Sequence, residues 1–105
     1  MVGKYSVVIT TSASMDEAKT IIDALLDEKL AACIQTIKID SHYIWKGDVC
    51  RDSEILLLIK TKKELFEEIK NTICKNHSYE VPEIILLPIE DGYPPYLAWI
   101  SEVCK

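Results

Sequence analysis

The feature that most restricts the fold is a pair of long strand-like segments on either side of a Lys-Gly-Asp turn signal at residues 46–48. Residues 33–45 carry apolar side chains at alternate positions, and residues 49–60 end in the apolar run 55–59, which is typical of a strand covered on both faces. A strand of about 13 residues spans ~40 Å, whereas a compact domain of about 100 residues has a radius of gyration of only ~13 Å. Unless it bends sharply, such a hairpin extends beyond its own domain.

Two details of this hairpin lead to further expectations. Its far part carries the large side chains of residues 43–45, which are unfavourable in water, so we expect an oligomer that buries the hairpin against neighbouring chains. Nearer its start, Ile34 and Ile37 have opposite parity, which predicts a β-bulge near residues 35–36.

The first part of the chain predicts a strand followed by a helix. Residues 4–11 are short, β-branched and apolar in the middle, as in a buried strand. A stripe of helical period then runs over residues 18–26, and Ser14 with Glu17 matches a capping box at its start. We expect this helix to end near residues 28–30.

The second part repeats the pattern. Thr61 with Glu64 is another capping-box match, at the start of a helix expected to end near His77. A strand over residues 83–89 and a short closing helix over residues 97–103 follow. The order β-α-β-β-α-β plus a C-terminal helix predicts one α+β domain, residues 1–105, with the ferredoxin-like arrangement.

Composition excludes several functions. The chain has 105 residues and a net charge of −5 spread evenly along it, which disfavours nucleic acid as a partner. No apolar stretch approaches the ~18 residues of a membrane helix. The four cysteines are widely spaced and the N-terminus has no secretory signal pattern, which favours reduced thiols in a cytoplasmic protein. With three glycines, two histidines and no hydrolase motif, the chain is expected not to be an enzyme.

Several motifs in order resemble the CutA divalent-cation tolerance proteins. They are E-K-L-A-A-C at residues 28–33, W-K-G at 45–47, I-L-L-L-I-K-T at 55–61, H-S-Y-E-V-P-E at 77–83 and Y-L-A-W at 96–99. The resemblance implies a ferredoxin-like fold, a homotrimer with β pairing between subunits, binding of copper or other divalent ions, and no established reaction. The fold also resembles that of the PII signalling proteins, which bind small ligands in clefts between subunits. A small-molecule sensor is therefore the alternative function.

The resemblance also points to candidate metal ligands. In the bacterial pattern, copper binding involves a cysteine near the end of the first strand and two adjacent histidines at the end of the second helix. This chain has Thr10 at the strand position and Asn76-His77 at the helix position. His77, with Cys74 three residues before it and Glu80 after it, is the candidate set for Cu(II) or Zn(II). The alternative is a histidine favoured by the helix dipole, and no metal is expected to be required for folding.

Other residues are candidates for a cleft or for the subunit interface. Lys60 stands beside the expected helix start at Thr61, where an anion can bind, or it pairs with a carboxylate. The resemblance adds Tyr79, Glu80 and Glu83 as cleft residues. Aromatic side chains of the hairpin and the last helix are expected to pack in the trimer interface, namely Tyr43, Trp45 and Trp99.

Overall fold

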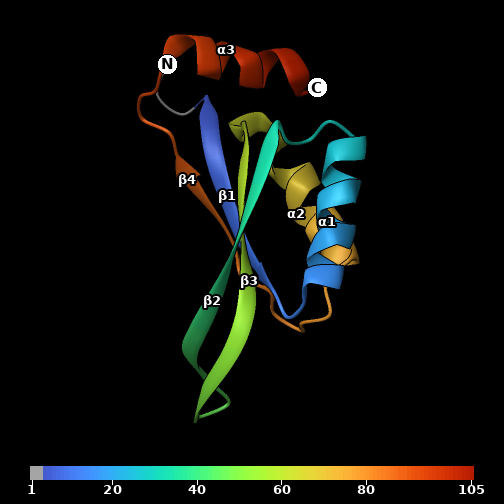
Figure 1. The fold of residues 1–105 in the computed structure, drawn as a ribbon, viewed down its shortest axis with the longest axis vertical. Helices are drawn as coiled ribbons and strands as arrows, with labels where there is room; N and C mark the ends of the chain where they lie inside the picture. The colour runs from blue at the N-terminus through green and yellow to red at the C-terminus, as the bar shows by residue number, and fades with distance from the viewer. Residues whose placement is uncertain (1–3) are drawn as a thin grey trace.

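The computed structural model describes residues 4–105 and has a four-stranded antiparallel sheet with three α-helices. The sheet order is β2-β3-β1-β4 (Figure 1). The two strands of the first β-α-β half, β1 and β2, therefore lie on either side of β3, and the two strands of the second half, β3 and β4, lie on either side of β1. This arrangement confirms the predicted ferredoxin-like α+β fold. The elements are β1 (Tyr5–Ser12), α1 (Met15–Asp27), β2 (Cys33–Trp45), β3 (Asp48–Lys62), a 3₁₀ turn η1 (Lys63–Leu65), α2 (Phe66–Lys75), β4 (Ile84–Pro88) and α3 (Pro94–Val103).

Helices α1 and α2 cover one face of the sheet (Figure 1). Side chains of β1 and β3 that point to that face are fully buried, among them Val8, Leu57 and Ile59. They meet the stripe of α1 and the apolar side of α2, where Ile21, Ile69 and Ile73 are also fully buried. Burying each such side chain contributes roughly 1.5–3 kcal/mol relative to leaving it in water, so this layer is the core.

Within residues 4–105, no helix covers the opposite face of the sheet, although many of its side chains are apolar. Ile85 and Leu87 of β4 are 46% and 47% exposed, and Ile37 of β2 is 49% exposed. Their cross-strand neighbours continue the apolar surface through β1 and β3, with Ile9 opposite both Leu58 and Ile85. We call this surface the open face, defined by Val7, Ile9, Ile37, Leu56, Leu58, Ile85 and Leu87.

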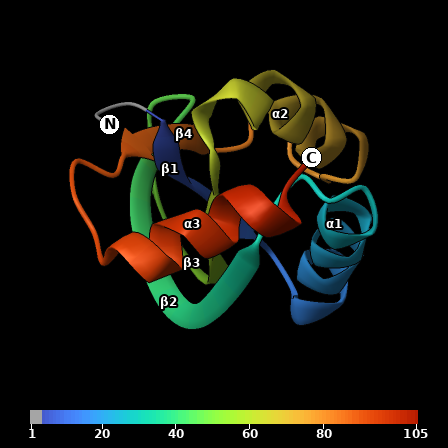
Figure 2. The ribbon, with the colours of Figure 1, turned by 90° about the horizontal axis from the view of Figure 1, so that it is seen from above.

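The C-terminal helix α3 lies across one end of the sheet rather than on either face (Figure 2). Its Ile100 is fully buried, and Ser101 Oγ lies 2.7 Å from the hydroxyl of Tyr5 at the start of β1. Pro94 and Pro95 begin the helix, where proline is tolerated because the first helical N–H groups have no partner within the helix.

The hairpin of β2 and β3 projects from the body as the sequence predicts. Only residues 55–62 of β3 pair with β1, so the remainder of the β2–β3 hairpin is a two-stranded arm. With this arm the molecule is 44 Å long and 26 Å wide. The arm ends in a two-residue turn in which Lys46 and Gly47 have φ of 50° and 84°, the conformation of a type I′ hairpin turn.

The prediction of a β-bulge in β2 is wrong. The β2–β3 register is unbroken from the pair Cys33–Lys60 to the pair Trp45–Asp48. Ile34 lies opposite the buried Ile59 and packs against the core, whereas Ile37 belongs to the open face. The change of parity therefore reflects a strand with apolar residues on both faces, which needs no inserted residue.

The first predicted capping box is half formed. Ser14 Oγ accepts the Glu17 N–H at 3.2 Å, but the Glu17 carboxylate does not reach back to Ser14. It accepts instead from the Ser12 hydroxyl at 2.7 Å and from the Ser78 N–H at 3.1 Å. The helix ends at Asp27, one residue before the expected range, and its C-cap is Glu28. Lys29 adopts φ of 56° and the Leu30 N–H makes a Schellman bond to the Leu25 carbonyl at 3.0 Å, which closes the helix.

The prediction of a second capping box, between Thr61 and Glu64, is wrong. Thr61 is still within β3, pairs with Ser6, and donates its hydroxyl to the Leu30 carbonyl at 2.6 Å. The helical segment begins two residues later with η1, whose N-cap Lys62 makes no side-chain cap bond. A buried tertiary acceptor therefore takes the hydroxyl that the local pattern assigns to a helix start.

Two hydroxyl groups on the core side of β1 have no such acceptor. Within residues 4–105, the side-chain oxygens of Ser6 and Thr10 are buried without a hydrogen-bond partner. We expect Thr10→Val to raise the free energy of unfolding by about 1 kcal/mol, because it removes a desolvated hydroxyl at little change in shape. Urea denaturation measures the change. The matched Thr61→Val should lower stability instead, since it leaves the Leu30 carbonyl unpaired, and equal effects of the two variants would contradict the assignment.

Candidate functional site

A cavity of about 400 Å³ lies where the arm joins the body, and it is the best candidate for a functional site. The arm supplies Tyr43, Trp45 and Glu54, and the loop between α2 and β4 supplies residues on the facing side. Tyr43 and Trp45 have the parity of Ile37, so the cavity opens on the same side of the sheet as the open face. The full lining is Thr11, Tyr43, Trp45, Glu54, Ser78, Tyr79, Glu80, Val81 and Glu83.

A tyrosine–glutamate pair joins the two walls of the cavity. The Tyr79 hydroxyl donates to Glu54 Oε2 at 2.6 Å, and Glu54 is only 7% exposed. Burial, together with the hydrogen bond to Glu54 and its negative charge, raises the pKa of Tyr79 far above that of a free tyrosine. The phenol therefore keeps its proton near neutral pH and ties the loop to β3.

A similar pair lies farther along the arm. The Tyr43 hydroxyl donates to Asp52 on the adjacent strand, and this hydrogen bond raises the pKa of Tyr43 to about 12. Both tyrosines of the cavity thus direct their hydroxyl hydrogens to carboxylates, and only their oxygen lone pairs and ring faces remain for another molecule.

His77 holds the loop from behind the cavity. Its side chain is fully buried, with Nε2 2.6 Å from the Thr11 carbonyl oxygen and Nδ1 accepting the Tyr79 N–H at 3.1 Å. A carbonyl can only accept and an N–H can only donate, so the proton is assigned to Nε2 and the lone pair of Nδ1 is used. Both ring nitrogens are therefore occupied by the protein itself.

Glu17 connects this loop to the start of α1. Its carboxylate accepts from Ser12 and Ser78, and Oε1 lies 3.7 Å from His77 Nδ1. Burial raises the pKa of the Glu17 carboxyl, but the hydrogen bonds from Ser78 and Ser12 outweigh burial, and the resulting pKa lies below the ordinary value. The ionised carboxylate thus helps to fix the loop that carries Tyr79.

The structure does not bring the predicted metal ligands together. Cys74 is exposed on α2, Glu80 is exposed at the cavity, and His77 is buried with both nitrogens in hydrogen bonds. Thr10, at the position of the bacterial cysteine, is fully buried in the core. Among residues 4–105, no three His, Cys, Asp or Glu side chains lie close enough to hold one ion. The donors of a single chain therefore do not fit a resident copper or zinc ion.

The predicted cleft residues separate into two places. Tyr79 and Glu83 line the cavity, whereas Lys60 is absent from its lining and donates from Nζ to Gln35 Oε1 at 2.6 Å. An anion site beside Lys60 was expected because Thr61 was predicted to start a helix. Thr61 lies within β3 instead, so no helix start is present beside Lys60.

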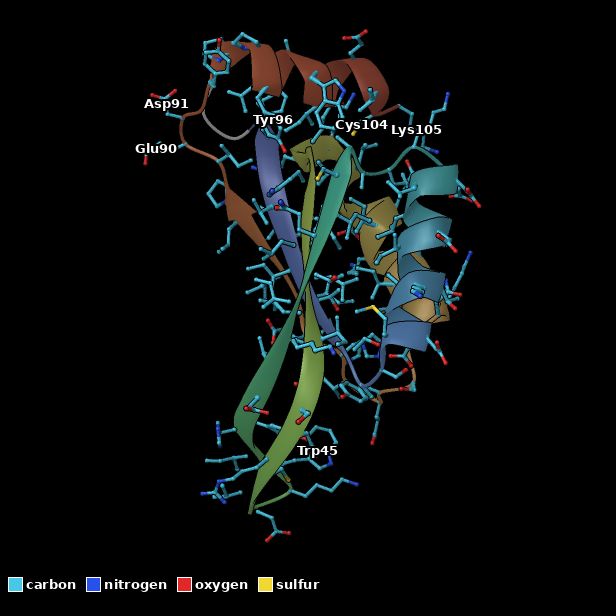
Figure 3. The ribbon with its side chains drawn as sticks, viewed as in Figure 1. Trp45, Glu90, Asp91, Tyr96, Cys104 and Lys105 are labelled. Atoms are coloured by element: carbon cyan, nitrogen blue, oxygen red, sulfur yellow. The ribbon has the colours of Figure 1, made fainter. Side chains whose placement is uncertain are left out.

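The predicted interface aromatics are all substantially exposed in one chain. Tyr43 and Trp45 lie on the arm and line the cavity, at 41% and 39% exposure. Trp99, 38% exposed, lies on α3, with its ring centroid 5.6 Å from that of Tyr96. Figure 3 shows Tyr96 at the end of the molecule opposite Trp45. Their burial by neighbouring chains stays a prediction.

Glu54 was not among the predicted site residues, although it is the most buried carboxylate at the cavity. The signal was a single acidic residue immediately before the apolar run 55–59. Such a carboxylate at the end of a buried apolar run needs a specific partner, and here the partner is the Tyr79 hydroxyl.

Over residues 4–105, no helix has the length and apolarity needed to cross a membrane.

Comparison with known proteins agrees with this fold. The family model of the CutA1 divalent ion tolerance protein matches residues 6–103. The divalent-cation tolerance protein CutA of Thermus thermophilus is 43% identical over 97 residues, which cover 91% of this chain and 94% of that protein. Protein CutA of Mus musculus is 41% identical over 104 residues, which cover 98% of this chain but only 59% of the mouse protein.

Solved structures give the same result. The structure of the periplasmic divalent cation tolerance protein CutA from Archaeoglobus fulgidus has a TM-score of 0.94 at 35% identity, covering 96% of this chain and 99% of that one. CutA1 from Oryza sativa has a TM-score of 0.93 at 36% identity, covering 99% and 96%. The predicted resemblance is thereby confirmed, and the chain belongs to the CutA1 divalent ion tolerance protein family.

Proposed function

We propose that this protein acts in divalent-cation tolerance as a non-catalytic homotrimer. The observation that carries the proposal is the family match, which runs through residues 6–103 and so includes every strand and helix apart from the first residue of β1. The relative from Thermus thermophilus bears the divalent-cation tolerance name and is covered almost completely by this chain.

The open face and the arm support assembly. Monomeric proteins rarely expose large contiguous apolar surfaces, and this sheet exposes one that is continuous through four strands. A compact assembly that turns three open faces inward covers this surface, and it also covers the arms.

The chemistry of the cavity supports a non-catalytic role. His77, beside the loop that lines the cavity, has both ring nitrogens in hydrogen bonds, and the hydroxyl hydrogens of Tyr43 and Tyr79 point to carboxylates. These groups stabilise the loop and the arm, and none of the three is available as a general base. The proposal includes no resident copper ion, because the donors of one chain do not converge.

Growth of a host strain at raised metal concentration tests this proposal. Expression of the protein should raise the concentration of Cu(II), Zn(II) or Cd(II) that still permits growth, compared with an empty vector. A variant that folds but does not assemble is the matched control and should give less protection. Growth identical to the empty vector at every metal concentration would overturn the proposal.

The cavity favours a second candidate function, a sensor that binds a small molecule near the subunit boundary. Its volume of about 400 Å³ is within the range of small-ligand sites, and it opens on the side that a neighbouring chain would cover. A thermal-shift screen separates the two candidates, because metals stabilise a metal-binding protein whereas nucleotides or other small molecules stabilise a sensor.

A further inference from the structure

We propose that the cavity at the root of the arm binds an organic cation with N–H donors, such as a short aliphatic diamine. This inference deepens the second candidate function and rests on it, because it names the class of ligand that would occupy the same cavity. It is independent of the proposed role in divalent-cation tolerance.

The charged groups of the lining have one sign. Glu54, Glu80 and Glu83 line the cavity, and within residues 4–105 no lysine, arginine or histidine does. The hydroxyl hydrogens of Tyr43 and Tyr79 are already donated to carboxylates, so these two side chains offer acceptor oxygens. A ligand that supplies hydrogen-bond donors and positive charge is complementary to such a wall, and an anion is not.

Glu54 provides the strongest single indication. It is 7% exposed, and its hydrogen-bond partner is an uncharged phenol, the Tyr79 hydroxyl. Among the described residues, 4–105, no cation lies within salt-bridge distance of its carboxylate. A buried carboxylate is costly without a compensating charge, and an ammonium group in the cavity supplies one.

The arrangement fits an organic cation better than a metal ion. The carboxylates of the cavity do not converge into a group that could hold a metal. They are distributed around a space of about 400 Å³ that also has aromatic walls from Tyr43, Trp45 and Tyr79. Aromatic ring faces attract ammonium groups, and separate carboxylates suit a molecule with ammonium groups at both ends.

Tryptophan fluorescence offers a direct test. The chain has two tryptophans, Trp45 in the cavity wall and Trp99 on α3, so Trp99→Phe leaves a single reporter at the site. Titration of this assembled protein with 1,4-diaminobutane should give a saturable change in Trp45 emission. Succinate, with two negative charges on a similar carbon chain, should give no change. Tetramethylammonium, which has no N–H donor, should bind more weakly than the diamine.

Two substitutions locate the binding. Glu54→Gln removes the buried charge but can still accept the Tyr79 hydroxyl, and it should raise the Kd of the diamine at least about tenfold. Glu80→Gln removes an exposed charge at the rim and should raise the Kd by about two- to fivefold, because exposed charge pairs are weaker. Glu67→Gln, an exposed position on α2 paired with Lys70, should leave the Kd unchanged. Circular dichroism and light scattering confirm that each variant is folded and has the parental mass.

Three outcomes would overturn the inference. One is the absence of saturable binding of the diamine to the folded protein, as expected if a side chain of a neighbouring chain already fills the cavity. Another is an unchanged Kd in both glutamate variants, and the third is equal binding of succinate. Each leaves the proposed role in divalent-cation tolerance untouched, because metal tolerance and oligomeric mass are measured separately.

Discussion

Replacing Leu87 by glutamate is expected to convert the assembled protein into folded monomers. Leu87 lies on the open face at the edge strand β4, opposite Val7, and is 47% exposed in a single chain. A monomer therefore tolerates a carboxylate at this position, because the side chain remains in contact with water. In the proposed trimer the same carboxylate is buried against apolar side chains in every subunit, and burying an unpaired charge costs several kcal/mol.

Light scattering at micromolar concentration measures this effect. The parental protein should have the mass of three chains of 11.9 kDa, and Leu87→Glu the mass of one, with an unchanged far-ultraviolet circular dichroism spectrum. Leu26→Glu is the matched control, since Leu26 is 42% exposed but lies on α1, away from the open face. It should keep the parental mass. A Leu87→Glu protein of parental mass would show that the open face is not the assembly surface.

The fold was predictable from the sequence because its signals are local. Alternation along the hairpin, the apolar run 55–59 and the helical stripe behind Ser14 each depend on side chains a few residues apart. The order of elements then leaves few arrangements, since a β-α-β unit in one sheet has a fixed handedness. The length of the hairpin strands followed from the strand rise alone, and the 44 Å length of the molecule agrees with it.

The two errors in the predicted capping boxes arose where a distant hydrogen-bond partner competes with a local one. A capping box pairs Glu17 with Ser14, yet the carboxylate bonds to Ser78, 61 residues away. A capping box likewise assigns Thr61 to a helix start, yet its hydroxyl reaches Leu30, 31 residues away. A pattern in the sequence cannot show these hydrogen-bond partners, because they are brought near only by the packing of the helices on the sheet.

The candidate site was predictable only in part for the same reason. Tyr79, Glu80 and Glu83 are adjacent in one loop, and the resemblance pointed to them. Glu54 and His77 take their roles from contacts across the fold, to Tyr79 and to the Thr11 carbonyl respectively. The His77–Thr11 bond joins residues 66 apart, so the sequence showed a histidine at a helix end but not that its nitrogens are already used.

His77→Ala is therefore expected to act on stability and not on metal binding. The substitution leaves the Thr11 carbonyl and the Tyr79 N–H without partners and opens a space where a fully buried ring stood. Each unpaired buried group costs about 1–3 kcal/mol, and with partial relaxation we expect a loss of about 2–4 kcal/mol in the free energy of unfolding. His77→Gln should lose less, because its side-chain amide can still donate to the Thr11 carbonyl.

Urea denaturation and calorimetric titration with Cu(II), without reducing agent, separate the two roles. Cys74→Ala is the matched control: Cys74 is exposed on the same helix end, so its loss should change stability by less than about 0.5 kcal/mol. The heats of Cu(II) binding should be weak in the parental protein and unchanged in His77→Ala, compared under conditions where both are folded. Saturable binding near one ion per chain that disappears in His77→Ala at little cost in stability would instead make His77 a metal ligand, and would require the loop between α2 and β4 to release its ring when the metal binds.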